Sequence, residues 1–92
     1  MANITAVHRE TTGTVVTGRY QMRGHQSVGG GTAGDVIYRD GGASGTIKFQ
    51  FNIGGGTQPI GLSFPADGIL FLTDVHVTLP TSAKTTAFVE AV

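Results

Sequence analysis

Few residues in this chain have the types and spacing that support chemistry. Asp74 and His76 are two positions apart, so in a strand a carboxylate and an imidazole would share one face. A hydrolytic site would also need a nucleophile in a Gly-x-Ser-x-Gly turn, and neither Ser44 nor Ser63 stands in that frame. We therefore interpret Asp74 and His76 as residues of a solvated strand face, and we expect the protein not to be an enzyme.

Metal and cofactor motifs are also weak. The histidines His8, His25 and His76 are far apart, none is paired at metal-ligand spacing, and the chain contains no cysteine. Residues 29–34 match the dinucleotide-binding pattern G-x-G-x-x-G, but that motif needs a helix after it, whereas residues 35–38 have the pattern of a strand. With 15 glycines in the chain, a chance match explains the pattern better. We expect no metal and no cofactor.

Charge is scarce in this protein. Charged residues make up 13% of the chain, against roughly 25% in an ordinary domain. Six basic and six acidic residues cancel, which removes the electrostatic signature of a nucleic-acid-binding protein. The chain has no apolar run long enough to span a membrane and no recognisable signal peptide. We expect neither nucleic acid nor membrane as a partner, and we expect much of the surface to contact other proteins.

Apolar residues at every second position predict strands from residue 45 onward. The clearest alternation covers residues 46–53, and a shorter one covers 60–64. The three glycines at 54–56 could form a tight turn between them. A final strand is predicted over 85–92, and no segment has the period of a helix. The pattern predicts an all-β fold, a small antiparallel β-sandwich or jelly-roll-like module.

The longest predicted strand, residues 69–79, is apolar on both faces at its start. Such a strand would be covered on both sides there, by a partner sheet or a neighbouring subunit. We predict that Leu70 and Leu72 contribute to a subunit interface. Between Gly54 and Phe71 the single charged residue is Asp67, so this whole stretch is expected to be covered in the same way.

The N-terminal third has weaker strand patterns. Residues 13–22 alternate loosely, and residues 23–35 contain five glycines, which predicts a flexible connector. Residues 1–33 carry three arginines against one glutamate, whereas residues 34–92 are mildly acidic. We expect an extended N-terminal arm with weak strands over residues 1–35, followed by a β-sandwich body over residues 36–92.

Residues 36–92 resemble small Gly/Thr-rich β-structured virion proteins of tailed bacteriophages. The resemblance rests on the turn at 40–45 leading into 46–49, on residues 67–79, and on a closing strand at 86–89. Such proteins include capsid decoration or cement proteins, which are often trimers between capsomers. The resemblance implies a virion structural protein, located on the capsid surface and assembled in the host cytoplasm. It implies the major capsid protein and further copies of the chain, as a homotrimer, as partners.

In this interpretation the arm contacts the capsid surface and the body contacts neighbouring copies. The alternative is a tail- or fibre-associated module that binds carbohydrate or a receptor. Such a module would expose aromatic side chains, and the chain offers two tyrosines, Tyr20 and Tyr38, and no tryptophan. The predicted capsid-binding residues are Ile4, Arg9, Arg19, Tyr20 and Arg23.

Overall fold

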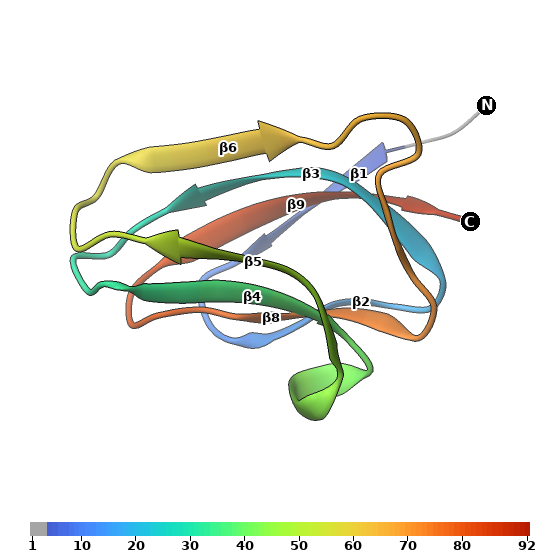
Figure 1. Cartoon of the computed structure of the whole chain (residues 1–92), viewed down its shortest axis with the longest axis horizontal. Helices are drawn as coiled ribbons and strands as arrows, with labels where there is room; N and C mark the ends of the chain where they lie inside the picture. Colours follow the sequence, from blue (N-terminus) through green and yellow to red (C-terminus); the bar gives the residue numbers. More distant parts are fainter. Residues whose placement is uncertain (1–3) are drawn as a thin grey trace.

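The computed structural model describes residues 4–92, which form two antiparallel sheets packed face to face (Figure 1). The order in sheet A is β1 (Ile4–Arg9), β9 (Lys84–Ala91), β3 (Tyr20–Val28) and β6 (Pro59–Ser63), with β7 (Ile69–Phe71) also paired with β3. The order in sheet B is β2 (Gly13–Thr17), β8 (Asp74–Thr78), β4 (Gly34–Asp40) and β5 (Thr46–Ile53). The predicted all-β sandwich is confirmed.

The core lies between the sheets and is built from alternate residues of both. Met22, Phe71 and Val89 of sheet A are fully buried against Tyr38 and Val77 of sheet B. This period of two follows from the pleat of a strand, which turns successive side chains to opposite faces. A three-residue 3-10 helix, η1 (Gly42–Ser44), follows β4, and no helix in residues 4–92 has the length and hydropathy to span a membrane.

Bulges modify the predicted alternation. In β5, Phe49 pairs with Tyr38 but Ile47 pairs with Arg39, so Lys48 is the extra residue. The bulge turns Ile47 to the outer face, where it is 47% exposed, although the sequence pattern had placed it with Phe49. Two further bulges leave Val15 of β2 and Arg23 of β3 as the extra residues.

The segment predicted as one strand over 69–79 is two strands in different sheets. β7 ends at Phe71 and β8 begins at Asp74, and Leu72 and Thr73 carry the chain from sheet A to sheet B. Their amides donate to the carboxylate of Asp40, each at 2.9 Å, instead of to a neighbouring strand. A side-chain acceptor distant in sequence therefore ends the strand that the local pattern predicts.

The predicted N-terminal arm is instead part of the sandwich. β1, β2 and β3 belong to the two sheets, and the nine-residue β3 lies between β9 and β6. Residues 23–28, predicted to be flexible, form the second half of β3. Gly24 permits this packing, because a Cβ there would lie 2.8 Å from the carbonyl oxygen of Leu62. Residues 1–3 of the predicted arm lie outside the described part of the chain.

The glycines at 54–56 do not form the predicted hairpin turn. They lie in the loop that leads from β5, at one edge of sheet B, to β6, at one edge of sheet A. In the turn before β7 the amide of Gly68 donates to the carbonyl oxygen of Pro65 at 3.1 Å; Gly68 has φ 75°, and a Cβ there would collide with the carbonyl oxygen of Met22. Glycine is therefore required at Gly68 by both backbone conformation and packing.

Candidate functional site: the open edge of the sandwich

Asp74 and His76 share the outer face of β8 as predicted, but the carboxylate of Asp74 is bound elsewhere. It accepts hydrogen bonds from the amides of Gly41 and Gly42, at 2.8 and 3.1 Å. The predicted solvated face is wrong for His76, which is only 7% exposed and whose Nδ1 has no hydrogen-bond partner among residues 4–92. Asp74 therefore holds a turn in place and does not orient the imidazole.

Asp40 makes the reciprocal contact. Its carboxylate accepts hydrogen bonds from the amides of Leu72, Thr73 and Asp74, at 2.9, 2.9 and 3.4 Å. The hydrogen bond from Leu72 is the main reason that the pKa of Asp40 lies below its ordinary value. The two aspartates together fasten the end of β4 to the connection between β7 and β8.

Replacing Asp40 with asparagine should lower the free energy of unfolding by about 1–2 kcal/mol, because the amide group cannot accept all of these hydrogen bonds and carries no charge. Urea titration followed by circular dichroism measures the change. The control is Asp35→Asn, since the exposed Asp35 accepts only from the side chains of Gln50 and Asn52. Equal losses in the two variants would contradict the role assigned to Asp40.

A chain of four polar side chains crosses the core between the sheets. The hydroxyl of Thr85 lies 2.6 Å from that of Tyr38 and 2.8 Å from that of Ser27, which in turn lies 3.1 Å from Nδ1 of His25. All four residues are at most 2% exposed. Burial raises the pKa of Tyr38 and lowers the pKa of His25, which favours the neutral form of each.

The contact between Ser27 and His25 has the form of a nucleophile beside a base, but a substrate cannot reach it. Ser27 has no exposed surface. The chain of hydroxyls instead satisfies polar groups that packing has removed from water. Sequence reasoning missed it because the members come from β3, β4 and β9, and no local pattern connects these strands.

A second polar group lies on the outer face of sheet A. Nδ1 of His8 is 3.0 Å from the hydroxyl of Thr86, and Nε2 is 3.3 Å from the carboxylate of Glu10. The side chains of His8 and Glu10 are 51% and 62% exposed, so water competes for these contacts. Beside them is a shallow depression of about 400 Å³, also lined by Gln26 and Lys84.

Four of the five predicted capsid-binding residues lie towards one end of sheet A. Ile4 is 56% exposed and stands opposite Glu90 in the register of β1 and β9. The guanidinium of Arg23 donates to the buried carboxylate of Glu90 at 2.7 Å. Arg19 is exposed in the bend before β3, whereas Tyr20 is half-buried and packs against the core.

The fifth, Arg9, lies at the opposite end of β1 and does not join this group. Its guanidinium donates to the carbonyl oxygens of Thr11 and Thr12, at 3.3 Å each. Of the two predicted interface residues, Leu72 is 60% exposed, whereas Leu70 is half-buried on β7. Leu72 alone therefore offers a large apolar surface to a neighbouring molecule.

An uncovered apolar surface lies where β5 and β6 form the edges of the two sheets. The register places Ile60 opposite Ser27 and Leu62 opposite His25, so both face the inside of the sandwich with these buried residues. They are nevertheless 39% and 49% exposed, and every residue of β6 is exposed. We call this region, residues 59–63 with the loop 54–58, the open edge.

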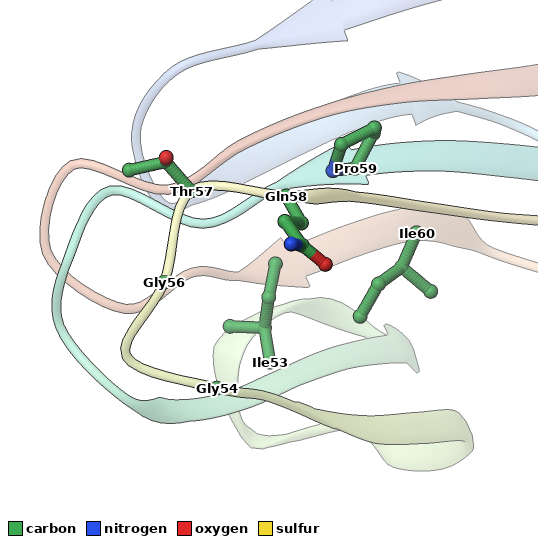
Figure 2. Close-up of a pocket in the computed structure, with 7 residues that line it drawn as sticks. All are labelled: Ile53, Gly54, Gly56, Thr57, Gln58, Pro59 and Ile60. Atoms are coloured by element: carbon green, nitrogen blue, oxygen red, sulfur yellow. The ribbon is translucent and has the colours of Figure 1, made fainter.

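A depression of about 380 Å³ lies at one end of the open edge (Figure 2). The side chains of Ile53, Gln58 and Ile60 are directed into it from β5, the loop and β6, while Thr57 points away. Figure 1 shows β6 at the top of the molecule, as the edge strand of sheet A beyond β3. The depression is therefore bounded by a loop and by an edge strand that pairs only with β3, and it is open to solvent.

Aromatic rings form the wall behind the open edge. His25 stacks on Phe51 with ring centres 4.7 Å apart, and Phe64 meets Phe49 edge to face at 4.9 Å. These rings fill the space between the sheets behind Ile60 and Leu62 and leave those two side chains at the surface. Contiguous exposed apolar surface of this kind marks a site of association in soluble proteins.

The sequence predicted that residues 54–71 are covered by a partner sheet or another subunit. Within the described chain the opposite sheet covers the end of this stretch, since Phe71 is fully buried in the core, but residues 54–63 are all exposed. Cover by another molecule stays a prediction.

The open edge can bind by burying apolar surface and by pairing strands. Residues 54–66 contain no charged side chain, so ion pairs cannot contribute there. Within residues 4–92, no three His, Asp or Glu side chains form a group that could hold a metal ion. Comparison with family models, with curated proteins and with solved structures gives no match to this chain.

Proposed function

We propose that this protein is a structural component of a phage virion, a capsid decoration or cement protein without enzymatic activity. It would bind the outer capsid surface and neighbouring copies of itself, with the major capsid protein as its main partner. The observation that carries the proposal is the open edge, an uncharged and exposed apolar surface of the kind at which soluble proteins associate. The resemblance of residues 36–92 to small phage virion proteins supports the choice of a phage shell as the assembly.

Two separate surfaces support binding to both shell and sister copies. The end of sheet A that would contact the capsid carries the exposed Ile4 and Arg19 and the half-buried Arg23, which is paired with Glu90. The open edge would join copies to one another. Leu72, which lies outside the open edge, is the candidate for a head-to-tail contact within a trimer. Weak contacts of this kind add up on a symmetric shell, because each bound copy raises the effective concentration of the next.

The test uses particles of the phage that encodes the protein. Shells made without it should assemble but rupture at a lower temperature, and adding the purified protein should restore the rupture temperature. Arg19→Ala should weaken binding to these shells in a co-sedimentation assay, whereas Lys48→Ala, on the exposed side of β5, should not. Shells whose rupture temperature is the same with and without the protein would contradict the proposal.

The alternative, a tail or fibre module that binds carbohydrate or a receptor, predicts a different result in the same experiment. Phage lacking the protein would then have stable shells but fail to attach to the host. The tyrosines that such a module would use are engaged in packing, because Tyr38 is fully buried and Tyr20 packs against the core. The decoration proposal is therefore the better supported of the two.

A further inference from the structure

The edge strands of the two sheets differ in how they are protected from pairing with other chains. Natural proteins protect such edges with charged residues, bulges, prolines or very short strands. β1 ends in Arg9, β2 contains the bulge at Val15, β5 carries Lys48 within its bulge, and β7 is three residues long. β6 has no charge and no bulge, and its one protecting residue is Pro59 at the first position.

The free hydrogen-bonding groups of β6 follow from its pairing with β3. The amide of Phe64, the residue after β6, donates to the carbonyl oxygen of Arg23 at 2.9 Å. The backbone amide and carbonyl groups of Phe64 are therefore directed towards β3. Because these groups alternate along an antiparallel strand, Ile60 and Leu62 also bond towards β3. The amides of Gly61 and Ser63 and the carbonyl oxygen of Pro59 are therefore directed to the unpaired side.

We propose that β6 pairs in antiparallel fashion with β6 of a second copy, about a two-fold axis that passes through Gly61. In this register the backbone amide of each Gly61 donates a hydrogen bond to the carbonyl oxygen of Gly61 in the other copy. Each Ser63 amide donates to the carbonyl oxygen of Pro59 in the other copy. Proline has no amide hydrogen to donate in return, and in this register Pro59 lies at the ends of the ladder, where only the outermost hydrogen bonds are lost. Sheet A then continues from one subunit into the next.

The same register suits the side chains. Ile60 of one copy stands opposite Leu62 of the other, in a position without backbone hydrogen bonds where side chains approach most closely. Both face the inside of the sandwich, so pairing buries the apolar side chains that the monomer leaves exposed. Since residues 54–66 carry no charge, two copies meet without repulsion, whereas a charged partner would find no complement.

This contact rests on the proposed function in one respect, because that proposal states that copies of the protein bind one another. The contact specifies which strands they use. A two-fold contact cannot close a trimer, which needs a head-to-tail interface. If Leu72 contributes to a trimer, the β6 contact would join such trimers in pairs. The contact therefore predicts that blocking β6 halves the mass of the assembly, whatever its total size.

The first test is the mass of the isolated protein, measured by sedimentation equilibrium at micromolar concentration. Leu62→Lys should halve the mass, because a charged side chain would be buried opposite Ile60 of the other copy. Ile4→Lys is the matched control, an exposed aliphatic residue on the edge strand β1, and it should leave the mass unchanged. Circular dichroism and thermal unfolding establish that both variants are folded. A monomeric wild-type protein, or equal mass for Leu62→Lys and wild type, would overturn the contact.

The second test is a disulfide at the two-fold axis. The chain has no cysteine, and a Cβ at Gly61 would make only ordinary contacts, the nearest at 3.5 Å from the carbonyl oxygen of His25. Directly opposed, hydrogen-bonded residues have Cα atoms about 5.5 Å apart, within the range that a disulfide spans. Oxidised Gly61→Cys should form covalent dimers much faster than Ser44→Cys, which is exposed in η1. Equal rates would contradict the two-fold register.

The two proposals can fail separately. If the protein stabilises shells but Leu62→Lys leaves the mass of the isolated assembly unchanged, the β6 contact is wrong and the decoration function is retained. Protein that pairs through β6 but leaves the rupture temperature of shells unchanged would overturn the decoration function and retain the contact.

Discussion

Thr85→Val should lower the free energy of unfolding by about 2–4 kcal/mol, as measured by urea titration. The hydroxyl of Thr85 is the hydrogen-bond partner of both Tyr38 and Ser27 in the core. Valine has nearly the same shape, so the cavity is negligible and the loss comes from polar groups left unpaired. Tyr38 loses its partner at 2.6 Å, whereas Ser27 retains the contact with His25.

The control is the adjacent residue on the opposite face of β9. Thr86→Val removes a hydroxyl that contacts the exposed His8 and should cost about 0.5 kcal/mol or less. Adding Tyr38→Phe to Thr85→Val removes the unpaired phenol group and should recover part of the loss. If the double variant is destabilised by the sum of the single changes, the two hydroxyls are not coupled and the proposed network is wrong.

Acidification from about pH 7 to pH 5 should lower the melting temperature, because His25 is buried in its neutral form. Burial lowers the pKa of His25 below its ordinary value of 6.5, so the unfolded chain binds a proton that the folded protein resists. The contribution of His25 is full above pH 6.5 and is lost as the pH falls towards the lowered pKa. The slope from one such group is at most about 1.4 kcal/mol per pH unit.

His25→Phe keeps a ring against Phe51 and cannot be protonated, so it should remove this dependence above pH 5. Below about pH 4 both proteins should lose further stability, because the lowered pKa of Asp40 makes its contribution present at higher pH and lost on protonation. Melting curves followed by circular dichroism at each pH give the comparison. Parallel curves for wild type and His25→Phe between pH 7 and 5 would show that His25 is not the group responsible.

The strands with regular alternation could be predicted from the sequence. Residues 46–53 became β5, and the final strand was placed within one residue of β9. The bulge at Lys48 could not be predicted, because it depends on the partner strand β4. The break after Phe71 depends on Asp40, which is far from it in sequence and supplies acceptors for the amides of the connection.

The glycines were the main source of error. Residues 23–28 lack a clear alternation because Gly24 replaces a side chain, yet the neighbouring backbone of β6 requires a glycine there. The uncharged stretch at 54–66 was visible in the composition. The inward direction of Ile60 and Leu62 could not be predicted from the sequence. It is set by the register of β6 with β3, a strand that the sequence pattern did not reveal.

The strand order of sheet A has a consequence for the time at which the fold can form. β9 lies between β1 and β3, and Ile4 pairs with Glu90. On the ribosome, β1 therefore has no sheet partner until residues 84–91 have emerged, and β3 has only β6 and β7. The closure of such a long loop slows folding, so sheet A forms after these residues are synthesised and does not build up strand by strand.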